Sequence, residues 1–372
     1  MKSIQEEGIS LWQLFVLIFV FGTGTTFLVG VGKGLNHGEW LVPLITPIFA
    51  IGLIFLHHFI INSAGQNKTF FQIIQICLGK KLGNLVIFFY TIYFLYMCVY
   101  ILMNFVFLME ITMLEKTPLA IISITFILAV AYTLYLGLDV LARLTELYFP
   151  IFFLSVLGVA IGLIFSKEMD IQNLFPILPD GIGPIFHDIF KRSLLFPYGE
   201  MIAFTIIFPK VIQKNFMRRV SIVTIIAIGL FLSFGVLLEI LTLGSELRNR
   251  SQYPFVSTVR EVEVLEFIAR IDILYIFHLM FGSFVKICLF FYAALIGLET
   301  ITNRRYRTFV YPFALLTAFF SIIEAPSQQS HLAIGMKFVW ILQIPYTFIF
   351  PVILAVILWW KRKKSMNAPL KY

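Results

Sequence analysis

Long apolar stretches separated by short polar segments dominate the pattern along this chain. Most stretches reach about twenty residues, the length that an α-helix needs to cross the hydrocarbon core of a bilayer. Membrane β-barrels are excluded, because their strands are about ten residues long and alternate in polarity. The pattern predicts an all-α polytopic membrane protein with ten transmembrane helices, at residues 9–31, 39–61, 84–109, 119–138, 142–165, 185–208, 217–243, 268–298, 306–324 and 336–360.

Composition supports a membrane protein. Residues of the types AVILMFWYC make up 60% of the 372 residues and charged residues 13%, whereas soluble globular proteins have about 45–50% and 25%. These values exclude a soluble enzyme, a coiled coil, a disordered chain and a disulfide-framed secreted domain. The first apolar run lacks a basic leading segment and a small-residue cleavage site, so we expect it to be retained as a helix.

The basic residues predict the orientation of the helices. Of the 28 lysines and arginines, 17 fall in segments that one alternating topology places on the same side. The positive-inside rule therefore predicts a cytoplasmic N-terminus, a cytoplasmic C-terminus and an even number of spans. Residues 361–372 form a basic cytoplasmic tail after Trp359 and Trp360. The net charge of +8 is explained by the basic residues of these cytoplasmic segments. The predicted partner is therefore the lipid bilayer, and no nucleic acid partner is predicted.

Ten spans divide into two halves of five, which have opposite topology because five is odd. We therefore expect one integral membrane domain built as an inverted repeat, with residues 9–165 as the first repeat and 185–360 as the second. The first helix of each half is interrupted by glycine or proline, at Phe21–Thr26 and at Phe196–Glu200. Matching interruptions in the two halves are typical of the substrate site of secondary transporters.

Interrupted helices leave free backbone N–H and C=O groups at mid-membrane depth. The N–H end suits a carboxylate and the C=O end suits an ammonium group, so two antiparallel interruptions are suited to a zwitterion such as an amino acid. Tyr96, near the middle of the third helix, adds a hydroxyl. The predicted ligand-binding residues are Gly22, Thr23, Gly24, Thr25, Tyr96, Pro197, Tyr198, Gly199 and Glu200.

Ionisable residues inside spans are candidates for ion coupling. Glu200 either caps the half-helix that follows it, or contacts a ligand amine or carries a proton. Lys286 in the eighth helix either pairs with Glu200 or snorkels towards the inner face. Its ammonium group would also suit the place where some transporters bind sodium. Asp272 belongs to the same candidate coupling or ion-pair group, with Arg270 or the outer loop at 244–267 as its partner.

The outer loop at 244–267 is either a solvated loop or a lid over an outer vestibule. Solvation at the membrane interface is the simplest interpretation of Glu239 near it, and is expected for the His57–His58 pair at the inner end of the second helix. The sequence has no GxSxG, HExxH or phosphate-binding loop, so no enzyme activity and no cofactor are predicted. The three cysteines and the scattered histidines have no metal-ligand spacing, so no metal site is predicted.

Three local motifs carry a family resemblance. They are Ile9–Leu14 (ISLWQL) before the first interruption, Gly137–Glu146 (GLDVLARLTE) followed by Pro150, and Leu195–Glu200 (LFPYGE) followed by a basic loop. Together with the length and the order of the spans, they make the chain resemble the endospore germination permease family. Its members are the GerAB-type B subunits of nutrient germinant receptors.

The resemblance implies a LeuT-like fold, similar to that of amino acid–polyamine–organocation transporters. It also implies a location in the spore inner membrane, sensing of a small nutrient, often an amino acid, and two partners, a membrane A subunit and a lipoprotein C subunit. Family ligand contacts would fall on Gly22 to Thr25 and on Pro197 to Glu200. Arg143 and Glu146 match a family motif and form either a structural ion pair or part of an inner gate.

Two alternatives remain open at this stage. The first is a proton- or cation-coupled amino acid transporter that uses the same pocket. The second is a structural or channel-forming partner with a vestigial pocket. The fold alone does not separate the receptor from the transporter.

Overall fold

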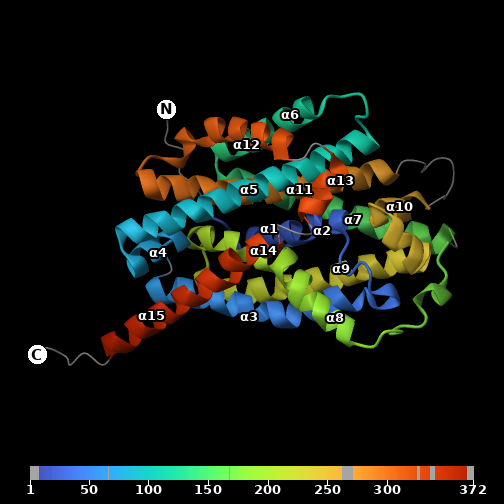
Figure 1. Ribbon diagram of the computed structural model, residues 1–372, viewed down its shortest axis with the longest axis horizontal. Coiled ribbons are helices and arrows are strands. Elements are labelled where there is room, and N and C mark those ends of the chain that lie inside the picture. Colours follow the sequence, from blue (N-terminus) through green and yellow to red (C-terminus); the bar gives the residue numbers. More distant parts are fainter. Residues whose placement is uncertain are drawn as a thin grey trace, which may run out of the picture.

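The computed structural model describes residues 8–65, 67–166, 168–261, 271–324, 327–335 and 340–366, and these residues are helical throughout apart from turns and one isolated β-bridge. Long helices run side by side along the longest axis of the molecule (Figure 1). The elements are α1 (Leu11–Gly24), α2 (Thr26–Val29), η1 (Asn36–Gly38), α3 (Leu41–Ala64), α4 (Phe70–Leu78), α5 (Lys80–Thr112), α6 (Leu119–Leu136), α7 (Leu138–Ser166), η2 (Ile171–Leu174), α8 (Gly183–Asp188), η3 (Ile189–Tyr198), η4 (Gly199–Ile206), η5 (Phe208–Lys210), α9 (Lys214–Arg250), α10 (Pro254–Arg260), α11 (Ile271–Thr302), η7 (Tyr306–Thr308), α12 (Val310–Glu324), α13 (Gln328–Ile334), α14 (Trp340–Ile344), η9 (Pro345–Ile349) and α15 (Phe350–Met366).

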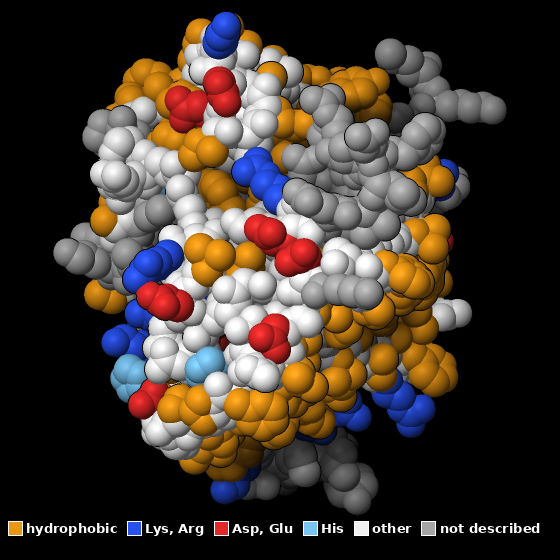
Figure 2. Space-filling model, turned by 90° about the vertical axis from the view of Figure 1, so that its right-hand side faces the viewer, with side chains coloured by type: hydrophobic (Ala, Val, Ile, Leu, Met, Phe, Trp, Pro, Cys, Tyr) orange, Lys and Arg blue, Asp and Glu red, His pale blue; other side chains and the backbone are white. Residues whose placement is uncertain are grey.

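The predicted class of polytopic helical membrane protein is confirmed. Among the described residues, seven helical segments are long and apolar enough to cross a bilayer, and α1 and α12 are shorter apolar helices. The predicted span at 185–208 is divided among α8, η3 and η4. Figure 2 shows the end of the bundle that carries α10, where charged side chains lie on the end face and apolar side chains cover the flank below it.

Short helices occupy segments where the sequence predicted loops. α4 begins with a capping box, in which the Thr69 hydroxyl accepts from the Gln72 N–H and the Gln72 side chain accepts from the Thr69 N–H. At the other end of the molecule, α9 continues to Arg250 through a kink at Gly244 (φ 71°, ψ 164°), and α10 follows it. The described residues 244–261 are therefore largely helical, while 262–270 lie outside the described residues, and the choice between a solvated segment and a lid stays a prediction.

The expected solvation of the histidine pair is also wrong. The side chains of His57 and His58 are 0% and 2% exposed, and the His58 ring stacks on Phe208 with 4.9 Å between ring centroids. The sequence places both near the end of an apolar run. However, α3 extends to Ala64, so the two rings lie inside the bundle.

Helix α11 occupies the centre of the bundle. In the most apolar stretch of 18 residues in this helix, 78% is buried. The helix packs on α5, α1 and α7. Figure 1 shows α6 with α12 along one edge of the molecule and α3 with α9 along the other. Gly24 and Gly282 meet where α1 crosses α11, and a Cβ on either glycine would overlap the backbone of the other. The two helices therefore approach each other closely beside the interruption of the first helix.

Backbone hydrogen bonds join the residues before α1 to the segment after η5. The Ile9 N–H donates to the Lys210 carbonyl and the Ile212 N–H donates to the Ile9 carbonyl, both at 3.0 Å. These bonds form a parallel bridge between Ile9 and Val211. The start of α1 is thereby tied to the segment that follows η5.

Candidate functional site

Both predicted interruptions coincide with breaks between helical elements, a one-residue break at Thr25 (φ −94°, ψ −11°) and a clear departure from helical dihedrals at Phe196. α1 ends at Gly24 and α2 begins at Thr26, with Thr25 between them. In the second segment, Phe196 is extended (φ −123°, ψ 121°) before Pro197. Proline has no N–H and clashes with the preceding turn, so a regular α-helix does not continue through it. Gly199 and Glu200 follow at the start of η4, which has 3₁₀ geometry.

Lys286 of α11 joins the two interrupted segments. Its Nζ lies 2.6 Å from Glu200 Oε2 and donates a hydrogen bond to Thr25 Oγ1 at 2.9 Å. The Lys286 and Glu200 side chains are 0% and 1% exposed. Lys286 therefore does not snorkel to the inner face, and Glu200 is its counter-ion.

Aromatic rings and an amide complete the surroundings of this ion pair. The Lys286 Nζ lies 4.2 Å from the centroid of the Phe196 ring and 5.1 Å from that of Phe21, within the range of cation–π attraction. Gln343 of α14 donates from Nε2 to Glu200 Oε1 at 2.9 Å. Each charge therefore has partners from at least two other elements. We refer to Thr25, Glu200, Lys286 and Gln343 as the central cluster.

Several buried polar atoms on the elements around the central cluster have no hydrogen-bond partner among the described residues. They are the hydroxyls of Tyr93 and Tyr198 and the Oε1 atom of Gln343. Tyr93 stacks on Tyr346 with 4.5 Å between ring centroids. A buried polar group without a partner costs about 1–3 kcal/mol. These atoms are thus suited to a polar ligand.

Sequence reasoning did not identify Gln343 or Tyr93 as part of the site. The available signal for Gln343 was a lone amide in the last apolar run. Tyr93 shares a helical face with Tyr96 by spacing, so the sequence did not indicate which of the two lies nearer Glu200.

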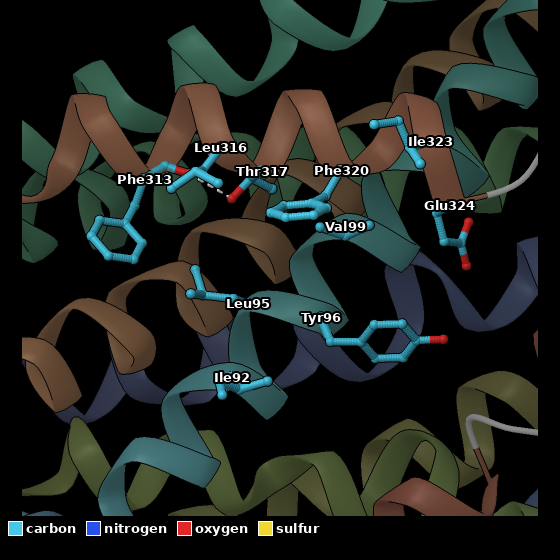
Figure 3. A pocket seen from close by; sticks show the side chains of 10 residues that line it. All are labelled: Ile92, Leu95, Tyr96, Val99, Phe313, Leu316, Thr317, Phe320, Ile323 and Glu324. Atoms are coloured by element: carbon cyan, nitrogen blue, oxygen red, sulfur yellow. Dashed lines mark hydrogen bonds between the residues drawn. The ribbon is translucent and has the colours of Figure 1, made fainter.

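Tyr96, the predicted ligand contact on the third helix, lies in a different place. It lines a cavity of about 520 Å³ between α5 and α12 whose lining includes none of the central cluster. Figure 3 shows Ile92, Leu95 and Tyr96 of α5 facing Phe313 and Phe320 of α12, with Glu324 at one end.

The remaining predicted residues lie at the two ends of the bundle. Glu146 Oε2 accepts from Gln13 Nε2 at 2.9 Å, so the segment with Arg143 and Glu146 contacts the start of α1. Gln13 also belongs to a capping box with Ser10. Two of the three resemblance motifs therefore touch each other. Asp272 belongs to α11, but its side chain lies outside the described residues.

A second buried charge cluster consists of Glu39, Glu239 and Arg248. We call it the outer cluster, after the side on which the sequence predicts it. Arg248 Nε donates to Glu239 Oε2 at 2.6 Å, its Nη1 pairs with Glu39, and its Nη2 donates to the Val31 carbonyl at 2.9 Å. All three charged side chains are at most 1% exposed. Glu239 is therefore buried and paired, and the simple interpretation of it as a solvated interface residue does not hold.

Lys33 beside this cluster and Glu39 within it have shifted pKa values. Burial, together with the nearby Arg248 charge, lowers the pKa of Lys33 to about 8. The Lys33 ammonium donates to the Ser251 carbonyl at 2.9 Å. Burial raises the pKa of the Glu39 carboxyl, although Arg248 and the Gly34 N–H oppose this shift.

Comparison with known proteins agrees with the three motifs. A family model described as spore germination protein, of the spore permease family, matches residues 8–330. Spore germination protein KB of Bacillus subtilis is 29% identical over 97% of each chain. Spore germination protein YndE of the same organism is 25% identical, with 87% of this chain and 88% of the relative covered. Spore germination protein XB of Bacillus anthracis is 22% identical over 68% of this chain and 69% of its own length. Because the family match covers most of the sequence, this chain belongs to the spore germination permease family.

Proposed function

We propose that this chain is the transporter-like B subunit of a spore nutrient germinant receptor. It binds a small nutrient of the amino acid class at mid-membrane and triggers germination together with a membrane A subunit and a lipoprotein C subunit. The observation that carries the proposal is the contact of Lys286 with Thr25 of one interrupted segment and Glu200 of the other. The names of the relatives, all spore germination proteins, support the same process.

The proposal includes the topology. Ten spans, arranged as a LeuT-like five-plus-five inverted repeat with both termini in the cytoplasm, would place the two interruptions in equivalent positions. The seven long spans, the shorter α1 and α12 and the divided α8–η4 segment are compatible with this number. The membrane is then the inner membrane of the spore.

A zwitterionic ligand would exchange partners with the central ion pair. Its ammonium group would take the place of the Lys286 ammonium at Glu200, and its carboxylate would face Lys286 and the free N–H groups at the interruption of the first helix. The nutrient must bind one arrangement of the two segments more tightly than the other, because otherwise it shifts no equilibrium. Gly22, Thr23, Gly24, Pro197, Tyr198 and Gly199 would shape the pocket.

The same ion pair also favours a second function, that of a proton-coupled amino acid transporter. A buried carboxylate paired with an amine is a suitable proton carrier. The Lys286 ammonium would occupy the position of a coupling cation, so such transport would not require sodium. Uptake of the nutrient into vesicles that contain only the purified chain would support the transporter and contradict the receptor.

The receptor proposal is tested by the loss of spore refractility on a panel of single nutrients. Deletion of the gene should silence the response to one nutrient, and the wild-type gene should restore it. The Lys286→Met variant should not restore the response, whereas Lys81→Met, which removes an exposed lysine at the start of α5, should. Restoration by Lys286→Met at normal protein levels would contradict the role of the central cluster.

A further inference from the structure

A polar cavity of about 670 Å³ lies at the inner end of the molecule, where the lining comes from α4, α11, η5 and the connection between α11 and α12. Its volume is within the range of small-molecule sites, roughly 300–1,000 Å³. It is separate from the central cluster, since its lining contains none of Thr25, Glu200, Lys286 and Gln343.

The cavity is rich in positive charge and in hydrogen-bond donors. Lys210, Arg304 and Arg305 line it together with a single carboxylate, that of Glu299. Glu299 Oε2 already accepts from the Tyr306 N–H at 2.9 Å. Donor groups come from the side chains of Asn67, Thr69, Gln72 and Asn303. Arginine forks and amide donors around a positive cavity match the geometry and charge of a phosphate group.

The basic residues come from distant parts of the sequence. The positive-inside rule explains why each of them lies on the inner side, but it does not require them to share one cavity. Lys210 ends η5, whereas Arg304 and Arg305 follow α11. The Lys210 Nζ also lies 5.4 Å from the centroid of the Tyr292 ring of α11. The fold therefore brings a segment of the second half's first helix against the inner end of α11.

The cavity lies next to the backbone bridge between Ile9 and Val211. Its wall includes Ile206, Pro209 and Lys210, which follow Glu200 along the same interrupted segment. The Lys210 carbonyl accepts from the Ile9 N–H in the bridge between the two halves. An anion held between Lys210 and the two arginines would fix this segment to α11 and so preserve the bridge.

We propose that this inner cavity binds a phosphate group and thereby stabilises the arrangement in which Ile9 is bridged to Val211. The phosphate is either a free anion from the cytoplasmic side or the headgroup of an anionic phospholipid. Binding at this cavity does not depend on the nutrient, so it is tested without one.

The test uses the full chain in lipid nanodiscs. In one arm, inorganic phosphate is titrated into nanodiscs of neutral phosphatidylcholine. In the other arm, phosphatidylglycerol replaces part of the neutral lipid and phosphate is absent. We expect a rise in melting temperature and slower hydrogen exchange of the Ile9 and Ile212 amides in at least one arm. A response in the first arm identifies a free anion, and a response in the second identifies a lipid headgroup.

Variants decide whether the effect comes from the cavity. The double variant Arg304→Gln/Arg305→Gln should reduce the rise in melting temperature and the slowing of hydrogen exchange at least tenfold, because it removes two of the three cations of the cavity. Arg362→Gln/Lys363→Gln removes the same charge from exposed side chains of α15 outside the cavity, and should respond as the wild type does. Equal melting temperatures of both variants without phosphate would show that folding is retained. No response in either arm, or the same response in both double variants, would overturn the proposal.

Discussion

The central cluster and the outer cluster are both buried, yet they differ in how completely their charges are bonded. In the outer cluster, three nitrogens of Arg248 reach two carboxylates and one backbone carbonyl. In the central cluster, Lys286 reaches one carboxylate, one hydroxyl and two aromatic rings. Among the described residues, the amide oxygen of Gln343 beside this pair has no partner.

The chemistry of the two cations accounts for the difference. A guanidinium group is planar and presents five donors in a fixed fork, which suits it to hold two acids and a carbonyl permanently. An ammonium group is a compact charge on a flexible stem, and a ligand amine can take its place. We infer that the outer cluster maintains structure, whereas the central cluster exchanges partners during function.

Removal of Arg248 should have the largest effect on stability. Arg248→Met leaves Glu39 and Glu239 buried without their cation, which costs about 3–5 kcal/mol for a broken buried pair. Unfolding by denaturant in detergent measures the loss. The control is Arg250→Met, whose partner Glu246 and own side chain are 78% and 76% exposed, so that less than about 1 kcal/mol is expected. Equal losses in the two variants would mean that the outer cluster does not maintain structure.

Neutralisation of Glu200 should act mainly on ligand binding. Glu200→Gln is expected to weaken binding of the nutrient identified in the spore panel by about 1.5–3 kcal/mol, the scale of a hydrogen bond to a charged group. Binding to the purified receptor measures this change. Glu168→Gln, an exposed carboxylate after α7, serves as the control. Unchanged affinity in a folded Glu200→Gln protein would remove Glu200 from the list of ligand contacts.

Replacement of Gln343 should have a smaller effect, because its amide is neutral. Gln343→Met removes the hydrogen bond to Glu200 at similar volume, so we expect a loss of about 0.5–1.5 kcal/mol in nutrient affinity. A double-mutant cycle with Glu200→Gln measures the coupling. Strict additivity of the two changes would show that the amide does not act through the carboxylate.

Lys33 provides a test of the outer cluster's surroundings by pH. Its pKa in the folded protein is about 8, below the ordinary 10.5, so the unfolded chain binds more protons between these values. The stability of the wild type should therefore rise as the pH increases from about 8 towards 10.5. The melting temperature of Lys33→Gln should lack this contribution between pH 7.5 and 9.5. Parallel curves for the two proteins would contradict the burial of the Lys33 charge.

The sequence predicted those features that depend on local backbone chemistry. Glycine and proline mark the interruptions at 21–26 and 196–200, where α1 ends at Gly24 and Phe196 leaves helical geometry. Long apolar runs likewise indicated the helices. Both features can be predicted from the sequence, because the free-energy cost of disrupting a helix, or of exposing its backbone to lipid, depends on a few consecutive residues.

Features that depend on contacts between distant segments could not be predicted from the sequence in the same way. Arg248 is 209 positions from Glu39, and Glu200 is 143 from Gln343. Hydropathy placed Arg248 in an outer loop because a charged residue near a helix end is usually solvated. Only the packing of α9 against the segment before α3 shows that the guanidinium is buried.

The glycine crossing of α1 and α11 also bears on how the molecule would move. With no side chain between Gly24 and Gly282, the crossing can act as a pivot, about which the helices tilt while their separation stays fixed. Lys286 lies one turn beyond this pivot, where displacements are small. At 1.5 Å per residue, a tilt of about 10° would move the far end of α11, twenty residues away, by ~5 Å. Small displacements at the central cluster would thus become large ones at the Thr302 end of α11.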